Sequence, residues 1–228
     1  MTGAKIGGVE ACVFDAYGTL FDFNSAAAKA RDALGEQADA LSGLWRDKQL
    51  QYTWLRALMR RHAPFWQVTG EALDYSLETL GIDDPALRER LMQLYLNLDA
   101  FAEVPEMLTT LKAAGIRTAI LTNGSPEMID AAVRNAGLET LLDAVLSVED
   151  VGVYKPDPAV YQLAVDRLGV AAPNISFQSS NAWDAAGAAS FGFRVVWCNR
   201  YGQRRERLPA GPDLEVTTLA GLPAILGL

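Results

Sequence analysis

Asp15 is the side chain of this 228-residue sequence best placed to act as a nucleophile. It directly follows residues 9–14, an apolar run that predicts a buried strand, and Gly18 allows the chain to turn sharply behind it. A carboxylate at the tip of a strand, next to the Thr19 hydroxyl and free backbone N–H groups, is able to attack a substrate covalently. An Asp is also common as the cap of a turn. This segment alone leaves both interpretations open.

Polar side chains also follow three other segments with the composition of strands, residues 118–121, 144–148 and 175–178. The carboxyl ends of parallel strands meet at one edge of a sheet, where the ligands of open α/β folds bind. Any one of these side chains could be an ordinary turn residue, but four strand ends that carry them indicate a site. The residues concerned are Thr122, Asn123, Lys155, Ser179, Ser180, Asn181 and Asp184.

Lys155 and Asp184 suggest how such a site could work. An ammonium group beside Asp15 would favour the ionised form of its carboxylate. Asp184, together with Lys155, could position and deprotonate a water that hydrolyses an ester on Asp15. Ser179 and Asn181 could hold Lys155 or the ester carbonyl by hydrogen bonds. The alternatives are a solvated lysine before a proline-rich turn and an acidic residue in the first turn of a helix, where negative charge is favoured.

The order of the expected elements predicts an α/β fold, with a Rossmann-like parallel sheet core and an inserted helical cap. Helical patterns without a convincing strand come first, at residues 26–34, 41–61, 69–80 and 85–98. Strands then alternate with helices, which is typical of a parallel sheet. We expect strands at 118–121, 144–148, 175–178, 194–197 and 215–217, and helices at 104–114, 158–168, 182–191 and after a Ser125 cap. The core then comprises residues 1–23 and 101–228, and the cap residues 24–100.

The helix expected at residues 41–61 has two faces of interest. Apolar side chains at helical spacing predict the cap's own core from Leu41, Leu44, Trp45, Tyr52, Leu55 and Met59. Arg46 and Leu50 lie one turn apart on another face, with Trp54 and Ala57. Arg46 could extend over apolar surface toward water. Above Asp15, its guanidinium would instead offer donors and positive charge to an emerging anion.

Composition limits the classes of function. Half of the residues are apolar, as in ordinary globular domains, and the net charge of −8 argues against non-specific nucleic-acid binding. Residues 1–10 contain no apolar signal segment, and no apolar run approaches the roughly 20 residues of a membrane span. Cys12 and Cys198 lie in strand-like runs without a Cys-x-x-Cys spacing. We interpret them as buried, reduced thiols in a cytoplasmic protein.

The strand-Asp-x-x-Gly-Thr pattern at Asp15 resembles the first motif of the haloacid dehalogenase superfamily. Most members are phosphatases, in which a second Asp two positions later protonates the departing alkoxide. Tyr17 stands there in this chain, and a phenol with an ordinary pKa of about 10 is no substitute for that acid. The exchange favours a leaving group such as halide, which needs no proton. Because Ser180 also replaces an Asp that helps to hold Mg²⁺ in the phosphatases, we expect no metal and no other cofactor.

Longer segments resemble the L-2-haloacid dehalogenases within this superfamily, over about residues 9–225. The Trp-Arg pair at residues 45–46 and the Ser-Ser-Asn-x-x-Asp pattern at residues 179–184 separate this family from the phosphatases. The similar segments are residues 14–22, 44–55, 122–126, 153–156 and 179–184.

The resemblance implies a role for each candidate residue. Asp15, beside Thr19, attacks C2 of the substrate, and Thr122 helps to bind the substrate carboxylate. The halide is taken up by Arg46 and Asn123. Ester hydrolysis is supported by Lys155, Tyr161, Ser179, Asn181 and Asp184. The pocket is lined by Tyr17, Leu50, Phe65 and Trp183.

The reaction expected from this resemblance is the hydrolysis of short L-2-haloalkanoic acids to D-2-hydroxy acids, because in-line attack on C2 inverts that centre once. The binding partners would be a small 2-haloacid and halide, and the resemblance suggests a homodimer formed through the cap. Two residues depart from the family pattern. Thr122 stands where Ser is more frequent, and Gln178 interrupts a core strand, where its amide must find a partner or cost about 1–3 kcal/mol.

Two other functions remain open from the sequence. One is a Mg²⁺-dependent small-molecule phosphatase of the same superfamily, against which Tyr17 and Ser180 argue. The other is a non-catalytic binding protein on the same fold, which would have no reason to keep Asp15 together with its charged neighbours. The sole histidine, His62, ends a basic helix, and no Gly-x-Ser-x-Gly or Walker motif is present. A Ser-His-Asp hydrolase and a P-loop enzyme are therefore poorly supported.

Overall fold

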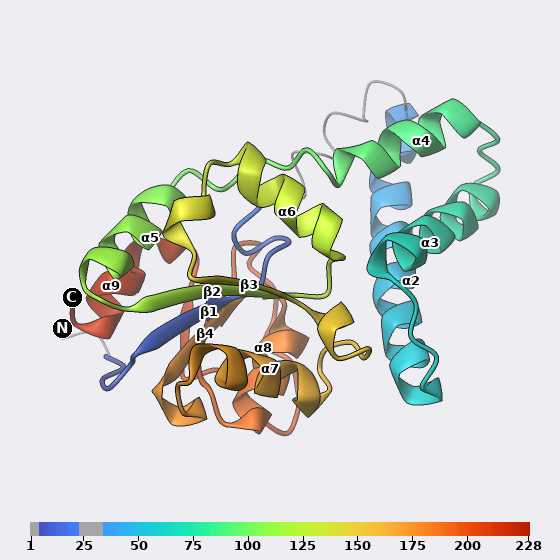
Figure 1. Cartoon of the computed structure of the whole chain (residues 1–228). Coiled ribbons are helices and arrows are strands. Elements are labelled where there is room, and N and C mark those ends of the chain that lie inside the picture. The colour runs from blue at the N-terminus through green and yellow to red at the C-terminus, as the bar shows by residue number, and fades with distance from the viewer. Residues whose placement is uncertain (1–4, 23–33) are drawn as a thin grey trace.

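The computed structural model describes residues 5–22 and 34–228. Its centre is a six-stranded sheet in the order β3-β2-β1-β4-β5-β6, in which all neighbouring strands are parallel (Figure 1). The strands are β1 (Ala11–Phe14), β2 (Arg117–Thr122), β3 (Ala144–Ser147), β4 (Ile175–Ser179), β5 (Arg194–Cys198) and β6 (Leu214–Val216). This arrangement confirms the Rossmann-like parallel sheet predicted from the sequence.

Helices cover both faces of the sheet, which is why its strands read as nearly continuous apolar runs. Helices α5 (Val104–Ala113) and α6 (Pro126–Asn135) lie on one face, and α7 (Pro158–Leu168) and α8 (Ala182–Phe191) lie on the other (Figure 1). The short helix α9 (Leu222–Leu226) packs beside α5. Strand β1 lies at the centre of this layer, and all four of its residues are fully buried.

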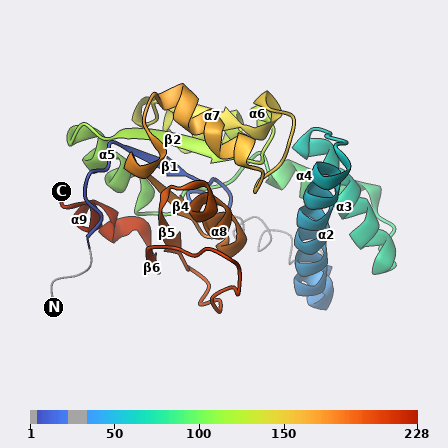
Figure 2. The same cartoon turned by 90° about the horizontal axis from the view of Figure 1, so that it is seen from below.

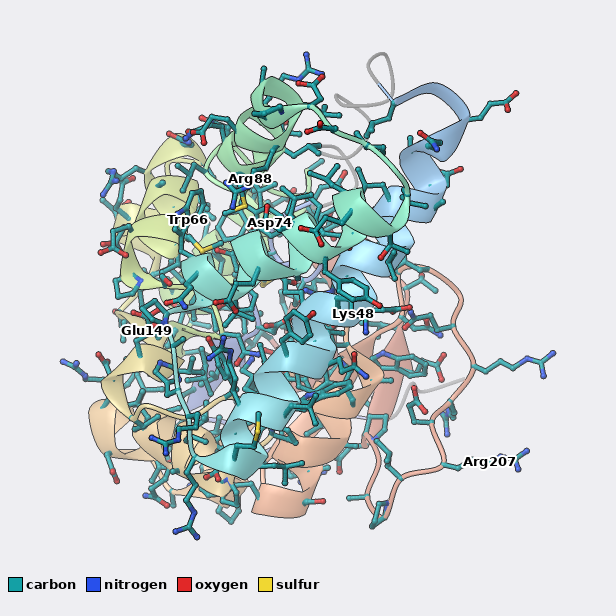
Figure 3. All side chains as sticks on the ribbon, turned by 90° about the vertical axis from the view of Figure 1, so that its right-hand side faces the viewer. Lys48, Trp66, Asp74, Arg88, Glu149 and Arg207 are labelled. Atoms are coloured by element: carbon teal, nitrogen blue, oxygen red, sulfur yellow. The ribbon has the colours of Figure 1, made fainter. Side chains whose placement is uncertain are left out.

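Between β1 and α5, the described residues form three helices, here called the cap: α2 (Ala38–Met59), α3 (Phe65–Thr79) and α4 (Pro85–Leu94). They stand at the end of the sheet toward which the strands point, and α2 crosses that end (Figures 1 and 2). Arg88 of α4 pairs with Asp74 of α3 through two hydrogen bonds of 2.5 and 3.0 Å (Figure 3). The helix expected at residues 26–34 lies almost wholly outside the described residues.

The buried face of α2 differs from the expected apolar stripe. It consists of Ala38, Leu41, Trp45, Gln49 and Thr53. Leu41 and Trp45 are buried as predicted, but the prediction was wrong for Leu55 and Met59, which are 44% and 61% exposed. Gln49 and Thr53 take the buried positions because their polar groups make hydrogen bonds there. Hydrophobic periodicity cannot predict the burial of polar residues such as these.

Contacts between the core and the cap also change two local predictions. Helix α3 begins at Phe65 rather than at residue 69, and the N–H groups of Phe65 and Trp66 are bound by Glu149 and Ser125 of the core. Ser125 precedes Pro126 at the start of α6, as expected, but its side chain does not cap that helix. Its hydroxyl donates to Glu149 instead and accepts from Trp66.

Two predictions about buried polar and sulfur groups are resolved by the packing. Cys12 and Cys198 are buried and unpaired, as expected. Gln178 is fully buried on β4, and its Nε2 amide donates to Ser176 Oγ at 2.6 Å. Its Oε1 atom has no hydrogen-bond partner within the described residues. Half of the amide is therefore satisfied by a neighbour on the same strand.

Short 3-10 helices complete the described chain. They span Gly35–Gln37, Glu139–Leu141, Val148–Asp150, Ala172–Asn174 and Leu219–Gly221. Across residues 5–22 and 34–228, none of the helices combines the length and apolar character required to span a membrane.

Candidate active site

The loops after four strands bring the candidate residues together at the edge of the sheet that faces the cap. Asp15 follows β1, Thr122 is the last residue of β2, and Ser179 is the last residue of β4. Lys155 enters from the loop between β3 and α7, and its backbone N–H donates to Asn123 Oδ1 at 3.2 Å. The predicted convergence of the four strand ends is confirmed.

Asp15 is enclosed by donors on both of its carboxylate oxygens. Oδ1 accepts a hydrogen bond of 3.1 Å from Lys155 Nζ. Oδ2 accepts from Thr19 Oγ1 at 3.1 Å, Asn181 Nδ2 at 2.9 Å and Ser179 Oγ at 3.4 Å. Ser179 and Asn181 thus hold the carboxylate itself, and no hydrogen bond joins either of them to Lys155 among the described residues. These four hydrogen bonds fix the direction in which Asp15 can attack, so its role as a mere turn cap is not supported.

Lys155 forms a buried bridge between two carboxylates. Its Nζ atom lies 2.8 Å from Asp184 Oδ2 as well as 3.1 Å from Asp15, and its side chain is 1% exposed. Burial by itself lowers the pKa of Lys155, but the charges of Asp15 and Asp184 and their hydrogen bonds outweigh it, so this pKa is raised. The ammonium group therefore stays charged at neutral pH.

Asp184 has the features of a group that accepts a proton. Its Oδ1 atom accepts a hydrogen bond of 2.8 Å from the Tyr161 hydroxyl. Burial raises the pKa of Asp184 in spite of the opposing charge of Lys155. Burial also raises the pKa of Tyr161 well above its ordinary value, so Tyr161 remains a donor. A carboxylate whose pKa is raised toward neutrality is a better general base than a free one.

The cap closes the site from above. Arg46 of α2 donates from Nη2 to Asn181 Oδ1 at 3.2 Å, which places the guanidinium beside the residue that holds Asp15. Helices α2 and α3 also contribute Leu50 and Phe65 to the wall of a cavity of about 20 Å³. That volume holds about one water molecule. The cavity is lined by Asp15, Tyr17, Arg46, Leu50, Phe65, Thr122, Asn123, Lys155, Asn181 and Trp183.

Tyr17 forms part of the apolar side of this cavity. Its ring stacks on Phe65 at a centroid distance of 6.4 Å and lies 6.1 Å from the ring of Tyr95. Burial raises the pKa of Tyr17 far above its ordinary value, so it is no source of protons at neutral pH. Gly124 makes this position possible, because a Cβ atom there would lie 2.7 Å from the Tyr17 hydroxyl oxygen.

Ser180 occupies the second position where phosphatases of the superfamily carry an acid. Its backbone N–H donates to Thr19 Oγ1 at 2.8 Å, so it helps to orient the hydroxyl that contacts Asp15. Within the part of the chain that the structure describes, no group of three or more His, Cys, Asp or Glu side chains is arranged to hold a metal ion. Ten of the fourteen candidate residues line the cavity, Thr19, Ser179 and Asp184 each contact a residue that does, and Tyr161 contacts Asp184.

The geometry agrees with comparisons to known proteins. The chain belongs to the haloacid dehalogenase-like hydrolases, whose family model matches residues 9–192. A curated relative, (S)-2-haloacid dehalogenase 4A of Burkholderia cepacia, is 47% identical over 96% of this chain and 95% of its own length. The match confirms the resemblance to the L-2-haloacid dehalogenases.

Two solved structures extend this similarity to three dimensions. A dehalogenase with an intermediate complex is 46% identical, with a TM-score of 0.95, and the match covers 98% of this chain and 99% of the other. L-2-haloacid dehalogenase from Xanthobacter autotrophicus with chloropropionic acid covalently bound is 39% identical, with a TM-score of 0.88. That match covers 95% of this chain and 98% of the other.

Residues that sequence reasoning missed connect the site to its surroundings. Gln49 accepts a hydrogen bond of 2.8 Å from Arg46, and Glu149 binds the first N–H of α3 next to the cavity. Gln49 follows Arg46 by three positions, a spacing at which helical side chains meet. That spacing is the only signal in the sequence, whereas nothing near Glu149 indicates its contact with the cap.

Proposed function

We propose that this protein hydrolyses short L-2-haloalkanoic acids to D-2-hydroxy acids through a covalent ester on Asp15. The main support for this proposal comes from the groups that surround the Asp15 carboxylate. It is held by Lys155 on one oxygen, and Arg46 stands close by with no ion pair to a carboxylate among the residues that the structure describes. Tyr17 replaces the acid that an alkoxide would need. These features suit the displacement of an anion that leaves without a proton.

In the first step, a carboxylate oxygen of Asp15 attacks C2 of the substrate in line with the carbon–halogen bond. A C–O bond forms, the C–halogen bond breaks, and the halide leaves with the bonding electron pair. The Arg46 guanidinium and the Asn123 amide take up the developing negative charge. The product of this step is an ester between Asp15 and the 2-carbon of the acid, with that centre inverted.

In the second step, water attacks the carboxyl carbon of the ester. Asp184 takes a proton from the water, and Lys155 and Tyr161 hold Asp184 in place for this transfer. Ser179 and Asn181 donate to the Asp15 carboxyl group during the attack. As the acyl C–O bond breaks, Asp184 returns its proton to the departing oxygen on C2, which frees the 2-hydroxy acid, and Asp15 is restored as a carboxylate when the second proton of the water is lost to solvent. Because C2 is not touched in this step, an L substrate gives a D product.

The cavity wall assigns the remaining candidate residues to substrate binding. Leu50, Phe65, Tyr17 and Trp183 offer apolar surface to the alkyl group. Thr122 stands at the end of β2, where its backbone and hydroxyl face the substrate carboxylate in this proposal. Its extra methyl group, relative to Ser, narrows the space for the substrate chain and favours short acids.

Several broader properties belong to the same proposal. The reaction needs neither metal nor another cofactor, because the leaving group is an anion and Lys155 supplies the positive charge beside Asp15. Residues 24–100 act as a cap on a core of residues 1–23 and 101–228. The net charge of −8 disfavours nucleic acid as a partner, and the buried thiols suit a cytoplasmic enzyme.

A homodimer through the cap is also part of the proposal. The exposed side chains of Leu55, Leu58, Met59 and Tyr75 support it, because they place apolar surface on the outer sides of α2 and α3. Analytical ultracentrifugation of the wild-type protein and of Leu58→Lys would test this assembly directly.

The function is tested by measuring halide release from L- and D-2-chloropropionate and the configuration of the lactate formed. We expect release from the L form only, with D-lactate as the product. An enzyme that releases no halide from either form, and instead hydrolyses p-nitrophenyl phosphate in the presence of Mg²⁺, would contradict the proposal.

A further inference from the structure

Gln49 is a fully buried polar residue of α2 that has no part in the mechanism described so far. Its Nε2 amide donates to Thr69 Oγ1 of α3 at 2.8 Å and to the Tyr95 hydroxyl oxygen at 3.3 Å. Thr69 and Tyr95 are buried as well. A buried amide is stable only where its hydrogen bonds are made. These two anchors therefore keep the Gln49 side chain in one orientation.

The opposite end of the same amide holds Arg46. Gln49 Oε1 accepts a hydrogen bond of 2.8 Å from Arg46 Nη1. A guanidinium group has donors only, so the amide oxygen must face Arg46 and the amide nitrogen must face the two hydroxyl groups. Arg46 Nη2 donates to Asn181 Oδ1 of the core. Both terminal nitrogens are thus held, one by the cap and one by the core.

The group that holds Arg46 from the cap is neutral, and this neutrality matters for the reaction. Within the described residues, Arg46 forms no ion pair with Asp or Glu. A carboxylate in place of the Gln49 amide would bind the same nitrogen but would cancel the charge that a departing anion requires. An aliphatic side chain would leave the charge but would free the guanidinium to adopt other rotamers.

We propose that Gln49 is a positioning residue that orients Arg46 toward the departing halide without neutralising it, and that Thr69 and Tyr95 anchor Gln49 for this purpose. The inference rests on the proposed dehalogenase function. It places the effect of Gln49 in the first step, because the charge of Arg46 acts on the departing halide, whereas Lys155, which links Asp15 to the proton acceptor Asp184, binds the other carboxylate oxygen.

The test compares two variants, Gln49→Glu and Gln49→Met, with the matched pair Gln51→Glu and Gln51→Met. Gln51 lies on the same helix but is exposed, and its side chain accepts a hydrogen bond from Lys48 rather than from Arg46. Rapid-quench experiments with 2-chloro- and 2-bromopropionate measure halide release and decay of the ester separately. Circular dichroism and the melting temperature report on folding, and the near-isosteric Gln49→Glu preserves the shape of the cap.

We expect both Gln49 variants to slow halide release by about ten- to hundredfold, the order of loss caused by a misplaced catalytic group. Decay of the ester should remain within about twofold of wild type. The loss should be larger for chloride than for bromide, because the poorer leaving group depends more on Arg46. Both Gln51 variants should match wild type in every rate.

Equal slowing of both steps would overturn the proposal in favour of a purely structural role for Gln49, and unchanged halide release would overturn it as well. A wild-type protein that releases no halide would refute the proposed function instead. In that case, halide binding tests the role of Gln49 without turnover: the chlorine NMR line of a chloride solution is measured with and without added protein, and its broadening reports bound chloride. Broadening by wild type that is absent with Gln49→Glu supports an oriented, unneutralised Arg46, and equal broadening by both contradicts it.

Discussion

Glu149 Oε1 of the core accepts a hydrogen bond of 3.0 Å from the backbone N–H of Phe65, the first residue of α3 in the cap. The first N–H groups of a helix have no partner within the helix, and a carboxylate is favoured at that end. The core therefore supplies the cap of a helix that belongs to the insertion. Since the Phe65 side chain lines the cavity, this contact fixes one wall of the site to the sheet.

Replacing Glu149 should loosen that wall. We expect Glu149→Ala to lower the free energy of unfolding by about 1 kcal/mol, as for other helix caps, and to raise KM for 2-chloropropionate more than it lowers kcat. Urea denaturation and steady-state kinetics provide the two measurements. The adjacent exposed residue offers the control Asp150→Ala, which should behave as wild type. An unchanged KM in Glu149→Ala would show that the contact does not position Phe65.

Arg46→Ala should lose most of its turnover while the fold stays intact. Removal of a preorganised donor to a developing anion typically costs on the order of 10²–10³ in rate. Steady-state halide release measures the loss, and the circular dichroism spectrum checks the fold. Arg90→Ala, at an exposed position of the cap, is the matched control. Near-normal turnover of Arg46→Ala would mean that its side chain only covers apolar surface.

Activity should survive exhaustive chelation and gain nothing from added Mg²⁺. The reason is that Tyr17 and Ser180 stand at the two positions where acids would hold the metal and protonate an alkoxide. The measurement is turnover of 2-chloropropionate after dialysis against EDTA, with and without Mg²⁺. A large loss of turnover after EDTA treatment that added Mg²⁺ reverses would instead favour the metal-dependent mechanism of the phosphatases.

The pH dependence of ester hydrolysis should reflect Asp184. Burial raises the pKa of Asp184 above the ordinary Asp value of about 3.9. As pH decreases through this raised pKa, the carboxylate becomes protonated and the rate of ester hydrolysis falls. The Tyr161 hydrogen bond lowers the pKa of Asp184, so Tyr161→Phe should move this loss to still higher pH. Single-turnover decay of the ester across pH measures both, with the surface variant Tyr75→Phe as control. Identical profiles for wild type and Tyr161→Phe would argue against Asp184 as the base.

The covalent step predicts where solvent oxygen is found. With enzyme in excess over substrate in heavy-oxygen water, the label should enter the peptide that carries Asp15, and the hydroxy acid should emerge unlabelled. Direct attack of water on C2 gives the reverse pattern with the same substrate, product and stereochemistry. Mass spectrometry of the peptide distinguishes them, and an unlabelled peptide after turnover would exclude the ester.

Much of the core was predictable because its signals are local. The strands are apolar runs bounded by turns, and Pro158 with Gly169 brackets α7 at the residues expected from the sequence. The candidate residues at the strand ends followed from the same reasoning, since a parallel sheet places its carboxyl ends together. Their roles required the resemblance to a family, because turn residues of the same types are common.

The cap was less predictable because its polar residues act across long separations in the chain. Gln49 is buried through partners on α3 and near the end of the cap, and Ser125 turns away from its own helix toward Glu149 and Trp66. Such choices depend on which elements pack together. For this reason the apolar stripe on α2 predicted burial correctly for Leu41 and Trp45 but wrongly for Leu55 and Met59, near the end of the helix.

The bridge of Lys155 between Asp15 and Asp184, with Arg46 nearby, has an electrostatic consequence for the encounter with substrate. Two acids and two bases leave the formal charge of this group at zero, inside a chain whose net charge is −8. An anionic substrate therefore meets no long-range attraction from the site and a weak repulsion from the rest of the molecule, which dissolved salt screens. The association rate of the substrate is therefore not increased by electrostatic steering, and substrate affinity depends on contacts made within the site.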